Sequence, residues 1–140
     1  KHLKNPQKYI DKKLELLNKR NKDFKKNILI CSLLLSGPTE IKRLNQRFRK
    51  KNKSTDILSF PFYGKKDLKY KMNCEKEVYL GDIIINLSKI KYKDKKLKFK
   101  EELTKLWLHG LVHLFGYVHK KDKDFYTMNK IEERYLQYLK

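Results

Sequence analysis

The sequence predicts a single α+β domain, and three observations lead to this fold class. The chain has 140 residues, a length that suits one domain. Three short runs rich in Ile, Leu, Val and Phe have the length of β-strands. Other segments place apolar residues at the spacing of amphipathic helices. We therefore expect short strands and helices that share one hydrophobic core.

Strands are expected at residues 28–35, 56–62 and 78–86. Pro61 confines the end of the second strand to a sheet edge or an irregular stretch, because proline cannot donate to a ladder. Gly81 lies inside the third strand, which predicts a bulge or a close approach of two backbones. Residues 64–77 are polar and are expected to form a mobile excursion between these two strands.

Helices are expected at residues 6–18, 39–48, 101–115 and, approximately, 122–139. Pro38 marks the start of the second helix. Gly116 is placed to end the third, which carries the strongest apolar stripe. The lysine-rich stretch 91–100 before this helix is expected to be a solvated linker or a helix end.

Composition excludes several classes of protein. The chain carries 36 Lys and Arg against 16 Asp and Glu, a formal charge of +20, and its 39% hydrophobic residues argue against wholesale disorder. Its longest apolar run is far shorter than the roughly twenty residues of a membrane span, and no secretory signal is visible. The lysine bias is typical of an AT-rich genome, so the charge has two explanations: codon drift on solvated surfaces, or attraction to RNA.

The two cysteines do not form a disulfide framework. Cys31 lies in an apolar run and is expected to be a small core residue, whereas Cys74 lies in a polar stretch without zinc-site spacing to other Cys or His. Both are expected to stay reduced, which favours a cytoplasmic location.

Three of the four histidines lie close together in the sequence. His109 and His113 are one helical turn apart, which lets two imidazoles reach one zinc ion at about 2.0–2.1 Å. Gly116 lets the chain turn back and present His119 as a third ligand. Three ligands with a fourth position for water are typical of a catalytic zinc site, so we expect about one Zn²⁺ per chain. For the pair alone, two ordinary polar residues are the simpler explanation.

The run from His109 to His119 reads His-Gly-Leu-Val-His-Leu-Phe-Gly-Tyr-Val-His. It resembles the YbeY family of bacterial metal-dependent endoribonucleases, whose signature is H-G-x-x-H-L-x-G-Y-D-H. Further matches to this family are the blocks 45–49 (NQRFR), 55–62 (TDILSFPF) and 80–85 (LGDIII), followed by Met128 and Glu132. Four blocks in the family's order make the resemblance specific.

The resemblance implies a zincin-like α+β fold over residues 1–140, with a mixed sheet packed against the helix that bears the metal in the C-terminal half. The chain departs from the family at two places. The family's strand before the first helix is absent, so that either it was trimmed or the sheet has one strand fewer. Val118 replaces the family's Asp, which removes any hydrogen bond that a ligand histidine would donate to that carboxylate. On this argument Val118→Asp should tighten zinc binding or raise cleavage by about tenfold; the alternative is a site repacked around Val118, in which a buried carboxylate would destabilise the fold.

The function implied by the resemblance is zinc-dependent hydrolysis of single-stranded RNA in the cytoplasm. Its implied setting is maturation of the 3′ end of 16S ribosomal RNA and ribosome quality control, with ribosomal RNA and the small subunit as partners. Arg49 matches a family arginine and is the candidate catalytic residue, because a guanidinium can bind a phosphate oxygen and stabilise developing charge; the alternative is a solvated arginine. Asp82 could orient a ligand or a water molecule, or it could have a structural role. A metal-activated water and the RNA 2′-hydroxyl are both compatible as the nucleophile.

Two other functions compete with this one. A non-catalytic RNA-binding or ribosome-binding factor is favoured by Val118 and the high charge. A zinc peptidase would share the His-x-x-x-His spacing, but the general base of H-E-x-x-H enzymes is replaced here by Gly110.

Overall fold

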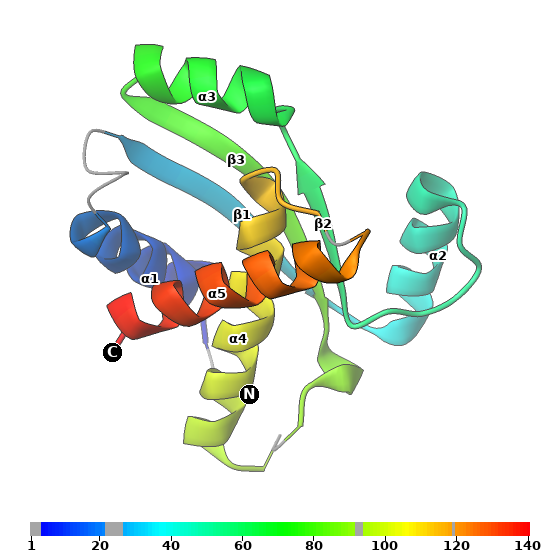
Figure 1. Cartoon of the computed structure of the whole chain (residues 1–140). Coiled ribbons are helices and arrows are strands. Elements are labelled where there is room, and N and C mark those ends of the chain that lie inside the picture. The colour runs from blue at the N-terminus through cyan, green and yellow to red at the C-terminus, as the bar shows by residue number, and fades with distance from the viewer. Residues whose placement is uncertain (1–3, 22–26, 92–93, 119) are drawn as a thin grey trace.

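The computed structural model describes residues 4–21, 27–91, 94–118 and 120–140. The elements formed by these residues are α1 (Pro6–Arg20), β1 (Ile28–Ser36), α2 (Pro38–Arg49), β2 (Ile57–Pro61), α3 (Lys65–Cys74), β3 (Glu77–Asn86), the 3-10 turn η2 (Leu87–Lys89), α4 (Lys96–Leu114) and α5 (Asp122–Tyr138) (Figure 1). The α+β class predicted from the sequence is confirmed.

The described residues form one mixed sheet of three strands in the order β1-β3-β2. β3 pairs in parallel with β1 and antiparallel with β2. The bulge predicted at Gly81 is present, because the β1 register shifts there and Leu80 has no partner on β1. Gly81 has φ +140, and a Cβ at this position would collide with the carbonyl oxygen of Phe60. The predicted close approach of two backbones is therefore also confirmed, and it draws β2 tightly onto β3.

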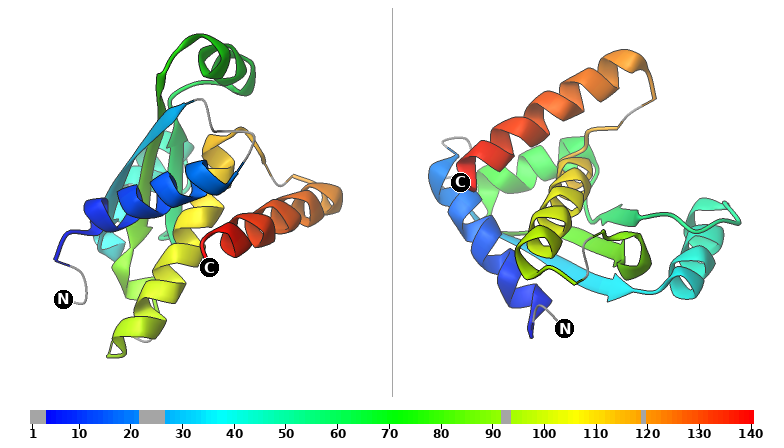
Figure 2. Two further views of the ribbon diagram at one scale, coloured as in Figure 1. Left: turned by 90° about the vertical axis from the view of Figure 1, so that its left-hand side faces the viewer. Right: turned by 90° about the horizontal axis from the view of Figure 1, so that it is seen from below.

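The helices α1, α4 and α5 lie on one side of the sheet (Figure 2): α1 packs on β1, α4 packs on β2 and β3, and α5 packs on α4 and α1. The core between them is large and well buried. Its fully buried side chains include Ile10, Leu14, Leu17, Ile83, Ile85, Leu103, Trp107 and Leu111. Burying one aliphatic side chain of this size contributes about 1.5–3 kcal/mol to stability, so α4 is held firmly against the sheet.

The outer face of the sheet is covered only in part, by α2. A small second cluster, formed by Ile41, Leu58 and Ile84, joins α2 to β2 and β3. Beside it lies a mainly apolar groove of about 500 Å³, which is lined by residues that include Leu34, Phe48 and Phe60. This groove lies on the opposite side of the sheet from α4.

Residues 64–77 do not form the predicted mobile excursion; that prediction is wrong. Ten of them form α3, which lies within the connection between β2 and β3 (Figure 1). Leu68 is 5% exposed, and the partly buried Met72 packs one turn later against the main core. Two apolar residues at this spacing are enough to dock a helix whose other face is solvated.

Part of the lysine-rich stretch 91–100 forms a helix end, one of the two forms predicted for it, and residues 92–93 lie outside the described residues. The helix begins at Lys96, five residues before the expected start at Glu101. Phe99 is 7% exposed and anchors this first turn in the core, which outweighs the surrounding lysines. At the other end of the helix, Gly116 has φ +100, a conformation that glycine adopts without strain, so the predicted helix stop is confirmed.

One side chain of α1 reaches the edge of β1 that faces away from β3. Gln7 Nε2 donates to the carbonyl oxygen of Cys31 at 2.8 Å, and the backbone N–H of Leu33 donates to Gln7 Oε1 at 2.8 Å. A second donor hydrogen of the amide bonds Asp11 at 2.7 Å. The amide therefore satisfies two backbone groups that no strand of the described sheet satisfies.

The cysteines lie in different environments, and both are free thiols. Cys31 is fully buried, as predicted. Burial raises the pKa of its thiol to about 12, although the nearby indole N–H of Trp107 opposes the increase. Cys74 is exposed at the end of α3. No helix in the described part of the chain is long and apolar enough to cross a membrane.

Candidate functional site

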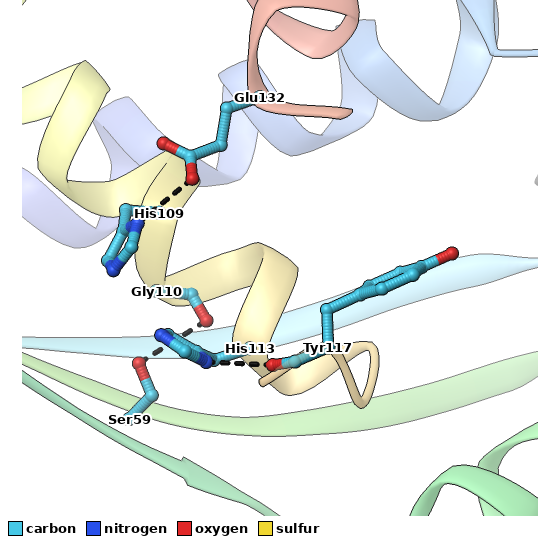
Figure 3. A network of polar contacts seen from close by, with 6 residues as sticks. All are labelled: Ser59, His109, Gly110, His113, Tyr117 and Glu132. Atoms are coloured by element: carbon cyan, nitrogen blue, oxygen red, sulfur yellow. Dashed lines mark hydrogen bonds and ion pairs between the residues drawn. The ribbon is translucent and has the colours of Figure 1, made fainter. Parts of the chain in front are cut away.

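Two of the three predicted metal ligands lie side by side on α4. His109 and His113 occupy successive turns near the C-terminal end of this helix, and their ring centroids are 4.8 Å apart with the rings perpendicular. Both side chains are partly buried. Figure 3 shows the two imidazoles with their partners from α5 and from the turn that follows α4. The predicted one-turn juxtaposition is therefore present.

His109 is oriented by a carboxylate from another helix. Its Nδ1 lies 2.9 Å from Oε2 of Glu132, which is on α5 (Figure 3). Because an ionised carboxylate only accepts hydrogen bonds, Nδ1 carries the proton, and a lone pair for a metal would come from Nε2. The hydrogen bond to Glu132 raises the pKa of His109 above its ordinary value, while burial opposes this increase.

His113 is oriented by the backbone. Its Nδ1 lies 2.8 Å from the carbonyl oxygen of Tyr117, and a carbonyl can only accept, so this nitrogen also carries a proton. The contact depends on the turn after α4. Gly116 adopts positive φ, which lets the chain fold back until the carbonyl of Tyr117 faces the ring. In His113, too, Nε2 is the nitrogen suited to a metal.

The donor chemistry of this pair fits zinc. Histidine ligands of zinc normally donate their other N–H to a carboxylate or a backbone carbonyl, which fixes the tautomer and the direction of the ring. His109 and His113 show one arrangement each. The third predicted ligand, His119, lies outside the described residues. Among the residues that are described, no three His, Cys, Asp or Glu side chains form a group that could hold a metal ion.

Gly110, between the histidines, lets α4 approach the sheet closely. A Cβ at this position would lie 2.8 Å from Ile57 Cδ1, 2.9 Å from Ser59 Oγ and 3.1 Å from Ile83 Cγ2. The position therefore has no room for a side chain, and a glutamate base of the peptidase type cannot occupy it. This contact argues further against a zinc peptidase.

The candidate catalytic residue Arg49 is tied to the strand beneath the histidines. Its Nη2 donates to the carbonyl oxygen of Ser59 at 2.5 Å, and its guanidinium lies 5.7 Å from the ring centroid of Phe60. Ser59 Oγ donates in turn to the carbonyl oxygen of Gly110 at 3.3 Å. Arg49 is exposed, but its anchor residue contacts the α4 turn that bears His109. The structure thus links the arginine block to the histidine block through β2.

Asp82 does not join the histidines. Its carboxylate accepts a hydrogen bond from the hydroxyl of Tyr79, and the oxygen of that hydroxyl accepts one from Ser32 Oγ, 3.0 Å away. Asp82 and Ser32 both line the groove on the outer face of the sheet. Of the two roles considered for Asp82, the structural one agrees with this position, and orientation of His109 or His113 does not.

Known proteins are similar to this chain in sequence and in fold. A family model described as Endoribonuclease YbeY matches residues 2–140. The chain belongs to the YbeY family of endoribonucleases. The predicted resemblance is therefore confirmed.

The chain also covers most of the length of individual YbeY relatives. The chain is 38% identical to the Endoribonuclease YbeY of Pelagibacter ubique over 143 residues, which cover 100% of this chain and 88% of the relative. It is 35% identical to that of Thermodesulfovibrio yellowstonii over 133 residues, 93% of this chain and 77% of the relative. The solution structure of TM1509 from Thermotoga maritima matches with a TM-score of 0.58 and 27% identity, over 95% of this chain and 80% of the other.

Glu132 matches the YbeY family in sequence, but the match alone did not indicate its role. Its partner His109 is 23 residues away, so only the packing of α5 on α4 brings them together. A signal existed nevertheless. Glu132 follows the buried Met128 by one helical turn, and residues four apart lie on the same helix face. A carboxylate on a core-facing helix surface requires a partner.

Proposed function

We propose that this chain is a zinc-dependent endoribonuclease that cuts single-stranded RNA, acting in 3′-end maturation of 16S ribosomal RNA and in ribosome quality control. The observation that carries the proposal is the oriented pair His109 and His113, whose Nδ1 atoms are both occupied by acceptors. Membership of a family of endoribonucleases supports the reaction class. The small ribosomal subunit, one zinc ion per chain and a cytoplasmic location are parts of the same proposal.

His109, His113 and His119 would hold the zinc ion. When bound, zinc supplies a Lewis acid that makes a water molecule more acidic and neutralises charge on a phosphoryl oxygen. Glu132 and Tyr117 contribute by fixing the tautomers of His109 and His113, so that neither imidazole has to reorganise when the zinc ion binds.

Arg49 would bind the phosphate. One N–H of its guanidinium holds the Ser59 carbonyl, which anchors the planar group, and the guanidinium has five N–H donors in total. A contact to a phosphate oxygen from this position stabilises negative charge that develops during cleavage. Because the anchor is a backbone atom, the direction of the guanidinium depends on β2 and not on a mutable side chain.

The experiment combines metal analysis with turnover. Purified protein reconstituted with zinc should contain about one zinc per chain and should cut single-stranded RNA in preference to duplex RNA. His113→Ala should lose both zinc and activity. Arg49→Ala should retain zinc and lose most activity, and Arg49→Lys should restore little, because an ammonium lacks the planar fork. RNA binding without turnover in the zinc-loaded protein would instead support the non-catalytic binding factor.

A further inference from the structure

A pocket of about 320 Å³ lies on the other side of the turn that follows α4. Three elements contribute to it: α3, the turn itself and α5. The residues that line it are Lys65, Leu68, Lys69, Met72, Asn73, Phe115, Tyr117, Ile131, Arg134 and Tyr135. The lining is therefore largely apolar and aromatic, and its charged groups are two lysines and one arginine.

The charge of this pocket has one sign. Lys65 and Lys69 project from α3 and Arg134 from α5, all three exposed, and the lining contains no acidic side chain. The Nζ of Lys65 lies 4.9 Å from the ring centroid of Tyr117, which holds this cation at the turn. Cations converging from two helices around an apolar lining are complementary to a ligand that carries both a phosphate and a flat ring.

The pocket adjoins the histidines through Tyr117. The carbonyl oxygen of this residue holds His113, whereas its side chain points away from both imidazoles (Figure 3) and lines the pocket. Lys65 is packed against the same turn, because a Cβ at Gly116 would lie 2.9 Å from its Cβ and Cγ. The two sites therefore lie on opposite sides of a single turn of backbone.

We propose that this pocket binds a nucleotide that flanks the scissile phosphate of single-stranded RNA, a proposal that rests on the proposed function. Lys65, Lys69 and Arg134 bind the backbone phosphate of that nucleotide, and the apolar lining contacts its ribose and base. The pocket thereby lets the enzyme bind the RNA strand at a nucleotide next to the bond that is cut. It reads no particular sequence, because contacts to phosphate and to the faces of rings are shared by all nucleotides.

The first test measures RNA binding in zinc-free protein, which separates binding from cleavage. The double variant Lys65→Gln with Lys69→Gln keeps the aliphatic stem beside Gly116 and removes two charges. The matched control, Lys8→Gln with Lys12→Gln, removes two charges from exposed positions of α1. A labelled oligouridylate, which has little structure of its own, serves as the probe. Circular dichroism and thermal melting confirm that each variant is folded.

The pocket variant should bind about tenfold more weakly, and the slope of log K against log salt should fall by up to about 0.7, the value for one lost phosphate contact. The control should bind within about twofold of the wild type, since its charges act only at a distance. Arg134→Gln, from a different helix, should weaken binding in the same direction. Equal weakening by the pocket and control variants would overturn the proposal, as would tighter binding of an acidic peptide of matched charge.

The second test separates this proposal from the proposed function. In zinc-loaded protein, the pocket variant should raise KM for the oligonucleotide with little change in kcat, because the contact is made in the ground state and in the transition state alike. If the wild type cuts RNA and the pocket variant has unchanged KM, the pocket proposal fails alone. If the zinc-loaded wild type does not cut RNA at all, the proposed function fails.

Discussion

The α4 turn with His109 and the next turn, with His113, hold their imidazoles by different means. His109 depends on Glu132, a side chain of α5 that is distant in sequence. His113 depends on the carbonyl of Tyr117, four residues away, and on the positive φ of Gly116. One ring is fixed by tertiary packing and the other by the local path of the backbone.

The difference shows which changes can disturb each histidine. Substitution of Glu132 removes the hydrogen-bond acceptor of His109. The acceptor of His113 is a backbone carbonyl, which no side-chain substitution removes directly. A backbone acceptor also carries no net charge, so the carboxylate alone adds an electrostatic preference for a cation at its histidine. The two rings should therefore respond differently to mutation and to pH.

Gly110→Ala should have the largest effect, since it disturbs both turns together. The new methyl group would overlap Ile57, Ser59 and Ile83, and overpacking of this kind typically costs about 1–3 kcal/mol. We expect the upper part of that range, measured by urea denaturation, and a loss of zinc affinity. Gly64→Ala is the control, because no atom lies within 4 Å of a Cβ there; an equal loss in both variants would contradict the argument.

Glu132→Gln should affect the His109 turn and spare the fold. Loss of an orienting carboxylate commonly lowers metal affinity by about 10–100-fold, and competition with a zinc chelator would measure the change. Glu133→Gln is the matched control, since the neighbouring residue is exposed. An affinity equal to that of the wild type would show that Glu132 does not support a metal ligand.

Gly116→Ala should disturb the His113 turn. Alanine at φ +100 is strained, and its Cβ would press on the side chain of Lys65. Strain of this kind costs about 1–3 kcal/mol, and we expect the low end, because the lysine stem can move. Zinc affinity should fall with stability. In zinc-free protein, the NMR signals of the His113 ring should change more than those of His109; the reverse order would contradict the assignment of each partner.

The pH dependence of stability should reveal His109 in zinc-free protein. Glu132 raises the pKa of His109 in the folded state, so the folded protein binds this proton more tightly than the unfolded chain. The resulting stabilisation is complete below about pH 6.5, the ordinary pKa of histidine, and is lost as the pH rises through the raised pKa. The difference in unfolding free energy between wild type and Glu132→Gln should therefore shrink as the pH rises above about 6.5.

Val118→Asp should have the smallest effect. The sequence alone suggested that this change would restore a missing carboxylate and tighten zinc binding about tenfold. In the structure, Val118 is 53% exposed, and His109 and His113 already have partners. We now expect a change below about 0.5 kcal/mol in stability and little change in zinc affinity. Val118→Asn controls for polarity, and a tenfold gain limited to the aspartate would restore the original argument.

The features that the sequence predicted correctly depend on local signals. A one-turn spacing placed His109 beside His113, and glycines inside or after apolar runs predicted the bulge at Gly81 and the helix stop at Gly116. In each case the neighbouring residues determine the conformation. Family membership and the α+β class followed from several such blocks in order.

The features that it missed depend on contacts between distant segments. α3 was not predicted because only Leu68 and Met72 mark its buried face, and its lysines are informative only when α5 is known to lie opposite. The carboxylate that orients His109 comes from Glu132, on another helix. Sequence spacing could not show this, because it does not define how α5 crosses α4.

Gln7 has a consequence for how this protein behaves at high concentration. The outer edge of β1 carries Ile28, Ile30 and Leu34, all at least 40% exposed, on a strand of nine residues. Such an edge is a template on which another chain can add a strand and begin to aggregate. The amide of Gln7 already occupies one donor and one acceptor in the middle of that edge. An incoming strand would have to break both hydrogen bonds before it could pair with β1, so the Gln7 amide protects this edge of the sheet against self-association.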